Sequence, residues 1–171
     1  MSLVVRKARK DDAVRVVEFW NRNFAAGHMK YTGTNWRRDS SDLKQFRERY
    51  AADKRGAFTF LAIDKSTSNV IGVCSARSNE RGRLSHRVDL GWWVDMEYGG
   101  RGVGTKLLLR ALLEAKRRGF KKAEAEAAVI NTSSVRLAKK CGFKVEGRLK
   151  AGMALDNGRY SDTYIFGKVL R

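Results

Sequence analysis

Residues 98–108 read YGGRGVGTKLL, and this stretch decides how the middle of the chain is interpreted. The run before it, RVDLGWWVD at residues 87–95, is rich in β-formers and predicts a strand. The run after it predicts a helix over residues 103–118, ended by Gly119. A strand, a glycine loop and a helix in this order place free backbone N–H groups at the positive end of a helix dipole. The stretch therefore predicts an anion-binding loop of the kind that holds phosphates, with Arg101 and Lys106 adding positive charge.

A tight turn is the alternative interpretation of the same glycines, because turns with positive φ also select glycine. Judged from the loop alone, the two interpretations carry equal weight. The loop matches neither common nucleotide motif. A Walker loop needs lysine directly after its second glycine, whereas Thr105 follows Gly104 here. The dinucleotide motif needs a βαβ frame with a later acidic residue, which this stretch does not supply.

Hydrophobic periods of two and of 3.6 residues alternate along the rest of the chain. Strands are expected at residues 3–8, 57–64, 69–76, 121–130, about 144–148 and about 160–170, and the second and third should pair as an antiparallel hairpin. Helices are expected from Asp11 or Asp12 to Gly27, around residues 43–50, and over residues 131–143. Residues 28–42 have no period and predict a loop. These elements indicate one mixed α/β domain spanning residues 1–171.

The charge of the chain is strongly positive. Lysine and arginine total 36 against 18 for aspartate and glutamate, which leaves a formal net charge of +18. Such a field attracts polyanions, among them nucleic acid, the ribosome, an anionic membrane and a phosphorylated cofactor. The cations are spread over the whole chain with no basic tail, so the composition does not choose between these partners.

Cysteines and histidines are too few and too scattered for a metal or disulfide framework. The chain has two of each, Cys74 and Cys141, His28 and His86, and their spacing matches no metal-ligand pattern. No apolar run approaches the roughly 20 residues of a membrane-spanning helix, and the N-terminus becomes charged too soon for a secretory signal. We therefore expect a cytoplasmic protein without a metal or a membrane segment.

Two motifs at a fixed spacing resemble those of a known family. The stretch WWVDMEYGGRGVGTKLL is followed, 27 residues after Gly104, by NTSSVRLAKKCGFKVEG, and together they resemble the acetyl-CoA-binding half of the GCN5-related N-acetyltransferases (GNAT). The tail EGRLKAGMALDNGRYSDTYIFGKVL is similar to that of the ribosomal-protein and phosphinothricin branches. The resemblance implies an acyl-CoA N-acyltransferase fold, in which helices flank a central, mostly antiparallel twisted sheet.

The resemblance also implies the residues that hold acetyl-CoA, which serves as co-substrate without a metal. In this family the backbone of the strand before the loop pairs with the pantetheine arm, the loop holds the pyrophosphate, and an asparagine near the next helix contacts the arm. The matching positions are Trp92, Trp93 and Val94 on the strand, Gly99, Gly100, Arg101, Gly102, Val103, Gly104 and Thr105 in the loop, and Asn131.

The chain departs from the family pattern at two positions. Gly99 stands where many members have arginine or glutamine, which removes a side chain but leaves the N–H groups of the loop. Ala138 stands where many members carry a tyrosine thought to protonate the leaving thiolate. Tyr160, Tyr164 or water would then serve as donor, or the thiolate leaves unaided, since a thiol pKa near 8.5 makes it a fair leaving group.

Acetyl transfer to an amine needs a base, because an amine is mostly protonated at neutral pH. Glu126 matches a position where the ribosomal-protein alanine acetyltransferases carry a glutamate base, and Asp89 lies on the strand before the loop. Glu124 shares a face with Glu126. Each of these is otherwise a solvated strand carboxylate. We expect Glu126 ahead of Asp89 as the base.

The acceptor is expected to be a primary amine, in first place the N-terminal α-amine of a protein or peptide. An α-amine, with a pKa near 7.7–8.0, loses its proton more readily than lysine, near 10.4. Tyr31 and Trp36 are expected to contact it from the irregular loop. A small amine or amino acid, as in the phosphinothricin branch, is one alternative. A basic module that binds the ribosome or nucleic acid with little catalysis is another. A monomer and a homodimer are both open.

Overall fold

The computed structural model describes residues 2–28, 30–31, 55–78 and 82–171. Seven strands form one sheet in the order β1-β2-β3-β4-β5-β7-β6. Neighbouring strands are antiparallel except β4 and β5, which are parallel. The strands are β1 (Leu3–Lys7), β2 (Ala57–Asp64), β3 (Val70–Ser78), β4 (Arg87–Val94), β5 (Lys122–Ala128), β6 (Lys144–Ala154) and β7 (Tyr160–Val169). The mixed α/β class and the mostly antiparallel sheet are confirmed.

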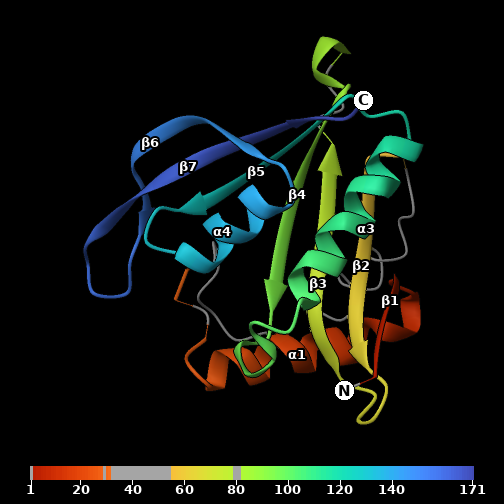
Figure 1. Ribbon diagram of the computed structural model, residues 1–171. Helices are drawn as coiled ribbons and strands as arrows, with labels where there is room; N and C mark the ends of the chain where they lie inside the picture. Colours follow the sequence, from red (N-terminus) through yellow and green to blue (C-terminus); the bar gives the residue numbers. More distant parts are fainter. Residues whose placement is uncertain (1, 29, 32–54, 79–81) are drawn as a thin grey trace.

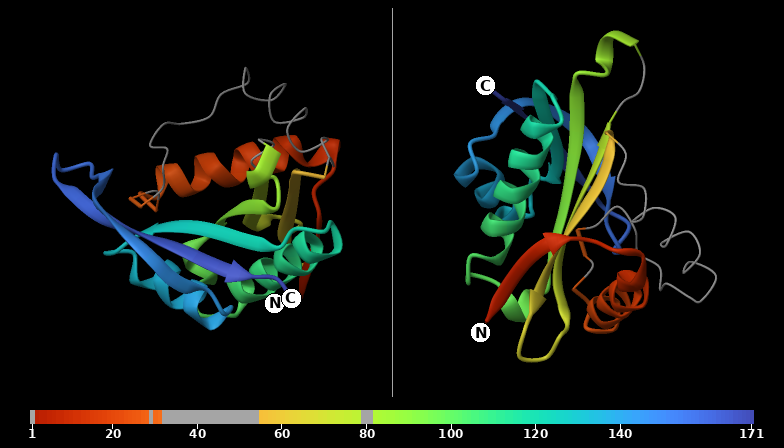
Figure 2. Two further views of the ribbon diagram at one scale, coloured as in Figure 1. Left: turned by 90° about the horizontal axis from the view of Figure 1, so that it is seen from above. Right: turned by 90° about the vertical axis from the view of Figure 1, so that its right-hand side faces the viewer.

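Helices cover both faces of this sheet. Helix α1 (Ala13–Ala25) lies on one face, and α3 (Val103–Arg117) and α4 (Thr132–Lys140) lie together on the other (Figure 2). Alternating strand residues divide the core accordingly. The larger apolar cluster includes Phe60, Leu90 and Leu107 and packs between the sheet and α3, while Phe19, Trp20 and Val73 belong to the cluster beneath α1. We refer below to these as the α3–α4 face and the α1 face.

Local signals in the sequence locate most of these elements. The hairpin of β2 and β3 is antiparallel as expected. Gly27, Gly119 and Gly142, expected to end three helices, follow α1, α3 and α4 with φ of 69°, 84° and 86°. A left-handed residue after the last turn of a helix is where glycine is favoured. The helix expected around residues 43–50 lies outside the described residues.

The structure corrects the sequence interpretation at two elements. Asp12 occupies the N-cap position of α1, as expected, but its carboxylate makes no capping hydrogen bond to α1. It instead accepts a hydrogen bond from the Arg9 N–H at 2.7 Å and pairs with Arg6 at 2.7 Å. A 3-10 turn at Lys10–Asp12 precedes α1. Strand β6 continues to Ala154 rather than ending near residue 148. Its pairing with β7 shifts between Leu149 and Met153, so the alternation that predicts a strand is broken there.

Candidate active site

The sheet opens between β4 and β5. These strands pair only where Arg87–Asp89 face Lys122–Glu124. Farther along, β4 stays paired with β3 and β5 with β7, and over the described lengths of both strands no register pair joins residues 90–94 to residues 125–128. Figure 1 shows the two strands running apart, with α4 beside the opening. The facing edges therefore present backbone N–H and C=O groups to any extended ligand that lies between them.

The glycine loop begins at the end of β4, where the gap is widest. A short 3-10 turn at Met96–Tyr98 leads into the loop, and Gly100 and Gly102 have φ of 72° and 76°. Gly102 is the N-cap residue of α3, and its carbonyl accepts the hydrogen bond from Lys106 N–H at 3.0 Å. The N–H groups of residues 103–105 precede that first helical bond and point out of the helix end. The loop thus has both properties considered from the sequence, the positive-φ turn and the exposed helix N-terminus.

Gly104 has a packing role that the sequence did not reveal. A Cβ atom at this position would lie 2.8 Å from Leu137 Cδ2 of α4 and 3.4 Å from Val94 Cγ2. The missing side chain therefore lets α3 pack directly against α4 and β4. At Gly100 and Gly102, by contrast, a Cβ would meet no atom within 4 Å. Their requirement for glycine comes from the backbone angle alone.

The side chains at the end of β4 are engaged in packing. Trp92 lies on the α3–α4 face with its ring 6.3 Å from that of Phe143, and Trp93 lies on the α1 face with its ring 4.9 Å from that of Trp20. Val94 packs against the α3–α4 core. Any contact of these residues with a ligand in the gap would therefore come from the backbone, as the family resemblance implies.

Asn131 caps α4, three residues after the end of β5. Its side-chain oxygen accepts a hydrogen bond from Ser134 N–H at 3.2 Å, so the residue has a structural role of its own. Ala138, at the position of the family's tyrosine, is fully buried in the core. Tyr164 is half-buried and packs against the α3–α4 core, whereas Tyr160 is 69% exposed. Tyr164 is thus the better enclosed of the two tyrosines.

Carboxylates line the α1 face beside the gap. Asp89 faces Glu124 across the last paired position of β4 and β5, and Glu126 follows two residues farther on, where the strands have separated. Glu124 is held by Arg87 at 3.0 Å and by Lys122 at 3.1 Å. Between described residues, no hydrogen bond or ion pair engages the side chain of Asp89 or of Glu126, and both residues are exposed. The structure thus places the two expected bases on the same face of neighbouring strands beside the gap, and it assigns Glu124 to an ion-pair network.

The environment of Asp89 favours its neutral form. Partial desolvation and then the negative charge of Glu124 raise the pKa of the Asp89 carboxyl, and Arg87 and Arg77 act against this shift. A carboxylate with a raised pKa is a stronger base, which suits proton abstraction. Of the two residues expected to contact the amine, Tyr31 is 40% exposed and Trp36 lies outside the described residues.

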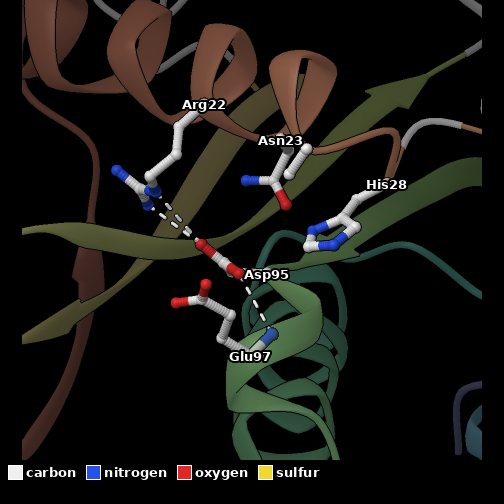
Figure 3. A pocket seen from close by; sticks show the side chains of 6 residues that line it. Arg22, Asn23, His28, Asp95 and Glu97 are labelled. Carbon is white, nitrogen blue, oxygen red and sulfur yellow. Dashed lines mark hydrogen bonds and ion pairs between the residues drawn. The ribbon is translucent and has the colours of Figure 1, made fainter.

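A buried aspartate that the sequence interpretation missed connects the glycine loop to α1. Asp95 follows β4 and is 3% exposed. Its Oδ2 accepts hydrogen bonds from Arg22 Nε at 3.2 Å and Nη2 at 3.1 Å, and its Oδ1 accepts one from Glu97 N–H at 3.1 Å. Arg22 also donates to the Val70 carbonyl at 2.9 Å. Asp95 therefore joins α1, β3 and the entrance of the loop (Figure 3).

A small cavity adjoins this ion pair. Its volume is about 20 Å³, enough for roughly one water molecule. The lining side chains come from the end of α1 and the start of the glycine loop: Arg22, Asn23, Ala26, His28, Asp95 and Glu97. The Nδ1 atom of His28 is buried here without a hydrogen-bond partner in the described part of the chain. A cavity of this size with a polar lining is suited to one water molecule next to Asp95.

A search of the described residues for two other features finds neither. No group of three or more His, Cys, Asp or Glu side chains is arranged to hold a metal ion. No helix in these residues combines the length and apolarity needed to cross a bilayer.

Known proteins share this sequence pattern and this architecture. Residues 2–144 match the model of the acetyltransferase (GNAT) domain. The L-amino acid N-acetyltransferase AaaT of Escherichia coli (strain K12) is 33% identical over 121 residues, 69% of this chain and 72% of that protein. The ribosomal-protein-S5-alanine acetyltransferase of Vibrio fischeri superposes with a TM-score of 0.83 at 23% identity, over 99% of this chain and 94% of the other. The phosphinothricin acetyltransferase of Sinorhizobium meliloti, solved in complex with AcCoA, has the same TM-score and identity over 99% and 89%.

The two superpositions are below 25% identity and establish the fold, and the sequence matches establish the family. The domain match extends over most of the chain, and the Escherichia coli relative aligns with 69% of it. The chain belongs to the GNAT family of N-acetyltransferases.

Proposed function

We propose that this protein transfers the acetyl group of acetyl-CoA to an α-amino group, in first place that of a peptide or protein N-terminus. The observation that carries the proposal is the gap between β4 and β5, which leads directly to the N-terminus of α3. Its open backbone edges suit the amide-containing arm of acetyl-CoA, and the free N–H groups at residues 103–105 suit the pyrophosphate. The AcCoA complex of the Sinorhizobium meliloti enzyme, which has the same fold, supports this assignment.

In this proposal the carboxylates beside the gap handle the proton of the amine. Glu126, the first carboxylate past the point where the strands separate, accepts it directly or through water, and Asp89 is the second candidate. The amine nitrogen then attacks the thioester carbonyl carbon, the C–N bond forms and the C–S bond breaks. The nitrogen, positively charged after the attack, gives up its second proton to water, which carries it to solvent or to the leaving thiolate. Backbone N–H groups on the open edge of β4 stabilise the oxyanion. The thiolate takes a proton from water or Tyr164, or leaves unaided, since its pKa is near 8.5.

The glycine loop offers a direct test of acetyl-CoA binding. Gly102→Val places a β-branched side chain in the cradle without a clash inside the protein, since a Cβ there meets no atom within 4 Å. We expect the Kd of acetyl-CoA, measured by calorimetry, to rise by at least about tenfold. This increase corresponds to the binding free energy of one or two lost charge-assisted hydrogen bonds. Gly104→Val is a poorer test because it would also collide with Leu137.

Gly119→Val is the matched control. Gly119 follows the opposite end of α3, has a φ of 84° and also has no atom within 4 Å of a built Cβ. Both variants therefore impose a similar backbone strain, and only Gly102 lies in the proposed cradle. Equal acetyl-CoA affinity in the two variants would place the pyrophosphate elsewhere.

The choice of an α-amine over a lysine side chain rests on the energy of deprotonation. At neutral pH an amine with a pKa near 7.7–8.0 is far easier to deprotonate than one near 10.4. The carboxylates Asp89, Glu124 and Glu126 also favour an acceptor without its own nearby carboxylate, as at a peptide N-terminus. A free L-amino acid is the second candidate, which the name of the Escherichia coli relative favours.

A competition assay separates these acceptors. Thiol release from acetyl-CoA would be followed with matched short peptides bearing a free α-amine or only a free ε-amine, with free L-amino acids, and with spermidine. We expect kcat/KM to be highest for the α-amine peptide and at least about tenfold lower for the ε-amine peptide. A higher kcat/KM for free L-amino acids than for every peptide would select the second candidate, and a preference for spermidine would contradict both.

A further inference from the structure

A run of cations lies at the end of α3 that is farther from the glycine loop. Residues 116–122 read KRRGFKK and contain five cations. Between Glu114 and Glu124 the chain has no aspartate or glutamate. Lysine- and arginine-rich runs of this length are typical of patches that bind nucleic acid, so the segment is a candidate site for a polyanion.

Contacts in the structure join this run to a turn from another part of the chain. The 3-10 turn η2 (Gly82–Leu84) precedes β4, and the carbonyl of His86 accepts a hydrogen bond from the Lys121 N–H at 2.9 Å. The His86 ring nitrogen Nδ1 donates to the carbonyl of Arg83 at 2.8 Å. The turn and the run therefore lie at the same end of the molecule (Figure 1). We call Arg83 together with residues 116–122 the basic end.

Three cations of the basic end have no charged partner within the described ranges. Arg83, Lys116 and Lys121 are exposed, and no hydrogen bond or ion pair between described residues engages their side chains. Lys122, by contrast, pairs with two carboxylates. The charges of the first three are therefore available to an external partner.

Ion pairs inside the protein leave further positive charge at this end. The buried carboxylate of Glu114 is shared by Arg117 at 2.7 Å, Arg118 at 2.8 Å and Lys7 at 2.9 Å. Three cations on one carboxylate keep the positive charge in excess. The pairing thus fixes the positions of the two arginines without cancelling their field.

Stabilisation of α3 does not account for all of these cations. A helix dipole is negative at the C-terminus, where it favours nearby cations, but it is equivalent to only about half an elementary charge. Lys116, Arg117 and Arg118 already carry three charges at the end of α3. Arg83 and Lys121 lie outside the helix, on two different connections. Their presence beside the helix end therefore favours a common external partner.

The basic end is remote from the glycine loop. Helix α3 has 15 residues, with Gly102 as its N-cap and Arg118 as its C-cap. At a rise of 1.5 Å per residue this corresponds to about 22 Å. Figure 1 shows the loop at the lower end of α3 and η2 beyond its upper end. A pyrophosphate held by the loop is therefore too far away to bond these cations.

We propose that the basic end docks duplex RNA through its phosphate backbone. Exposed cations from separate segments can neutralise several phosphates at once and release their counterions. The described segments 82–86 and 113–122 expose no aromatic side chain on which single-stranded bases could stack, since Phe120 is buried. The surface thus suits paired nucleic acid rather than single strands. This inference goes beyond the acetyl transfer and does not depend on it.

Two features favour RNA over DNA. Helix α3 meets the basic end with its last turn, so in the described part of the chain no helix lies there lengthwise to enter the major groove of DNA (Figure 1). The hydroxyl of Ser85 and the exposed ring of His86 lie between Arg83 and Lys121 in this contact chain. Groups of this kind bond the 2′-hydroxyls that an RNA duplex displays across its shallow minor groove.

The experiment is fluorescence anisotropy with a labelled 20-base-pair RNA duplex between about 50 and 200 mM salt. One variant combines Arg83→Gln, Lys116→Gln and Lys121→Gln, which leaves the ion pairs of Glu114 in place. We expect the slope of log Kobs against log salt to become shallower by about 3, one unit for each lost phosphate contact. Affinity at 100 mM salt should fall at least about tenfold.

The control variant removes the same net charge from other parts of the surface. It combines three exposed cations, Lys10→Gln, Arg15→Gln and Lys65→Gln. Its slope should change by less than about 1. Thiol release from acetyl-CoA should be the same in both triple variants and the wild type, because the substitutions leave the gap and the glycine loop intact. This second readout keeps a failure of the RNA proposal distinct from a failure of the proposed enzymatic function.

Any of five results would overturn the proposal. The first two are no binding of the RNA duplex by the wild type at 50 mM salt, and equal losses in the two triple variants. The third is equal binding of a DNA duplex of the same sequence. The fourth is displacement of the RNA by saturating acetyl-CoA, which would assign RNA binding to the acetyl-CoA site. The fifth is displacement by poly-L-glutamate at equal charge concentration, which would assign the basic end to an acidic protein.

Discussion

Glu126→Gln is expected to lower kcat by about a hundredfold while leaving the Kd of acetyl-CoA unchanged. Glutamine keeps the size and polarity of the side chain but cannot accept the amine proton, and removal of a positioned base typically costs a factor of 10² to 10⁴. Glu126 is exposed beside the gap and lies outside the glycine loop, so the binding of acetyl-CoA should not depend on it. Glu18→Gln, on the exposed side of α1, removes the same charge and should leave kcat within about twofold.

The pH–rate profile distinguishes a base from a merely structural carboxylate. A base works only when ionised, so kcat/KM of the wild type should rise with pH through the pKa of that group. The pKa of Asp89 is raised. If Asp89 is the base, the increase in kcat/KM should therefore occur at a higher pH than for an ordinary aspartate. Loss of the acidic limb in Glu126→Gln supports Glu126, and its loss only in Asp89→Asn supports Asp89. An unchanged profile in both variants contradicts a carboxylate base.

Arg22→Met is expected to lower the free energy of unfolding by about 3 kcal/mol, because it leaves the buried carboxylate of Asp95 without its cation. Breaking a buried ion pair from one side costs about 3–5 kcal/mol, and the lower end applies since the Arg22 side chain is 41% exposed. Urea unfolding measures the change. Arg15→Met, which removes an exposed cation from the same helix, should change stability by less than about 0.5 kcal/mol.

The double variant Arg22→Met/Asp95→Asn tests whether the charge of Asp95 is the cause. Asparagine keeps an oxygen that accepts the hydrogen bond from Glu97 N–H but carries no charge. We expect the double variant to be more stable than Arg22→Met alone, with a coupling free energy of at least about 1 kcal/mol. Additive losses would show that Asp95 and Arg22 contribute independently. Because Asp95 also anchors the entrance of the glycine loop, acetyl-CoA should bind more weakly to Arg22→Met than to Arg15→Met.

Local chemistry explains which parts of this structure the sequence predicts. Gly102, Gly119 and Gly142 mark helix ends because each position needs a left-handed backbone, a property of single residues. The alternation in residues 121–130 predicts β5 despite its many alanines, since the period is visible within a few residues. The placement of Asp89 and Glu126 on central strands also follows from the same alternation.

Features that depend on distant residues do not follow from such signals. Arg22 and Asp95 are 73 residues apart, and nothing near either one indicates its partner. The close approach of Gly104 to Leu137 depends on the packing of α3 against α4. The spacing of hydrophobic residues along the sequence does not specify this packing. The full length of β6 does not follow either, because its pairing with β7 resumes at Met153 only after an irregularity at Ala151, where φ is 50°, and such long-range pairing leaves no local pattern.

The separation of β4 from β5 divides the sheet into two blocks, and we call the short paired stretch that joins them the seam. Three register pairs join the block of β1–β4 to the block of β5, β7 and β6 within the sheet. Backbone amides next to this seam should therefore exchange their hydrogens through a local opening that costs less than global unfolding, and the two blocks are natural cooperative units. A ligand whose amides bridge the open edges would behave as a missing strand. During turnover the sheet would then alternate between a divided state without ligand and a continuous state with ligand. The missing pairing between β4 and β5 would thus make the free protein less stable locally and let the ligand rigidify it.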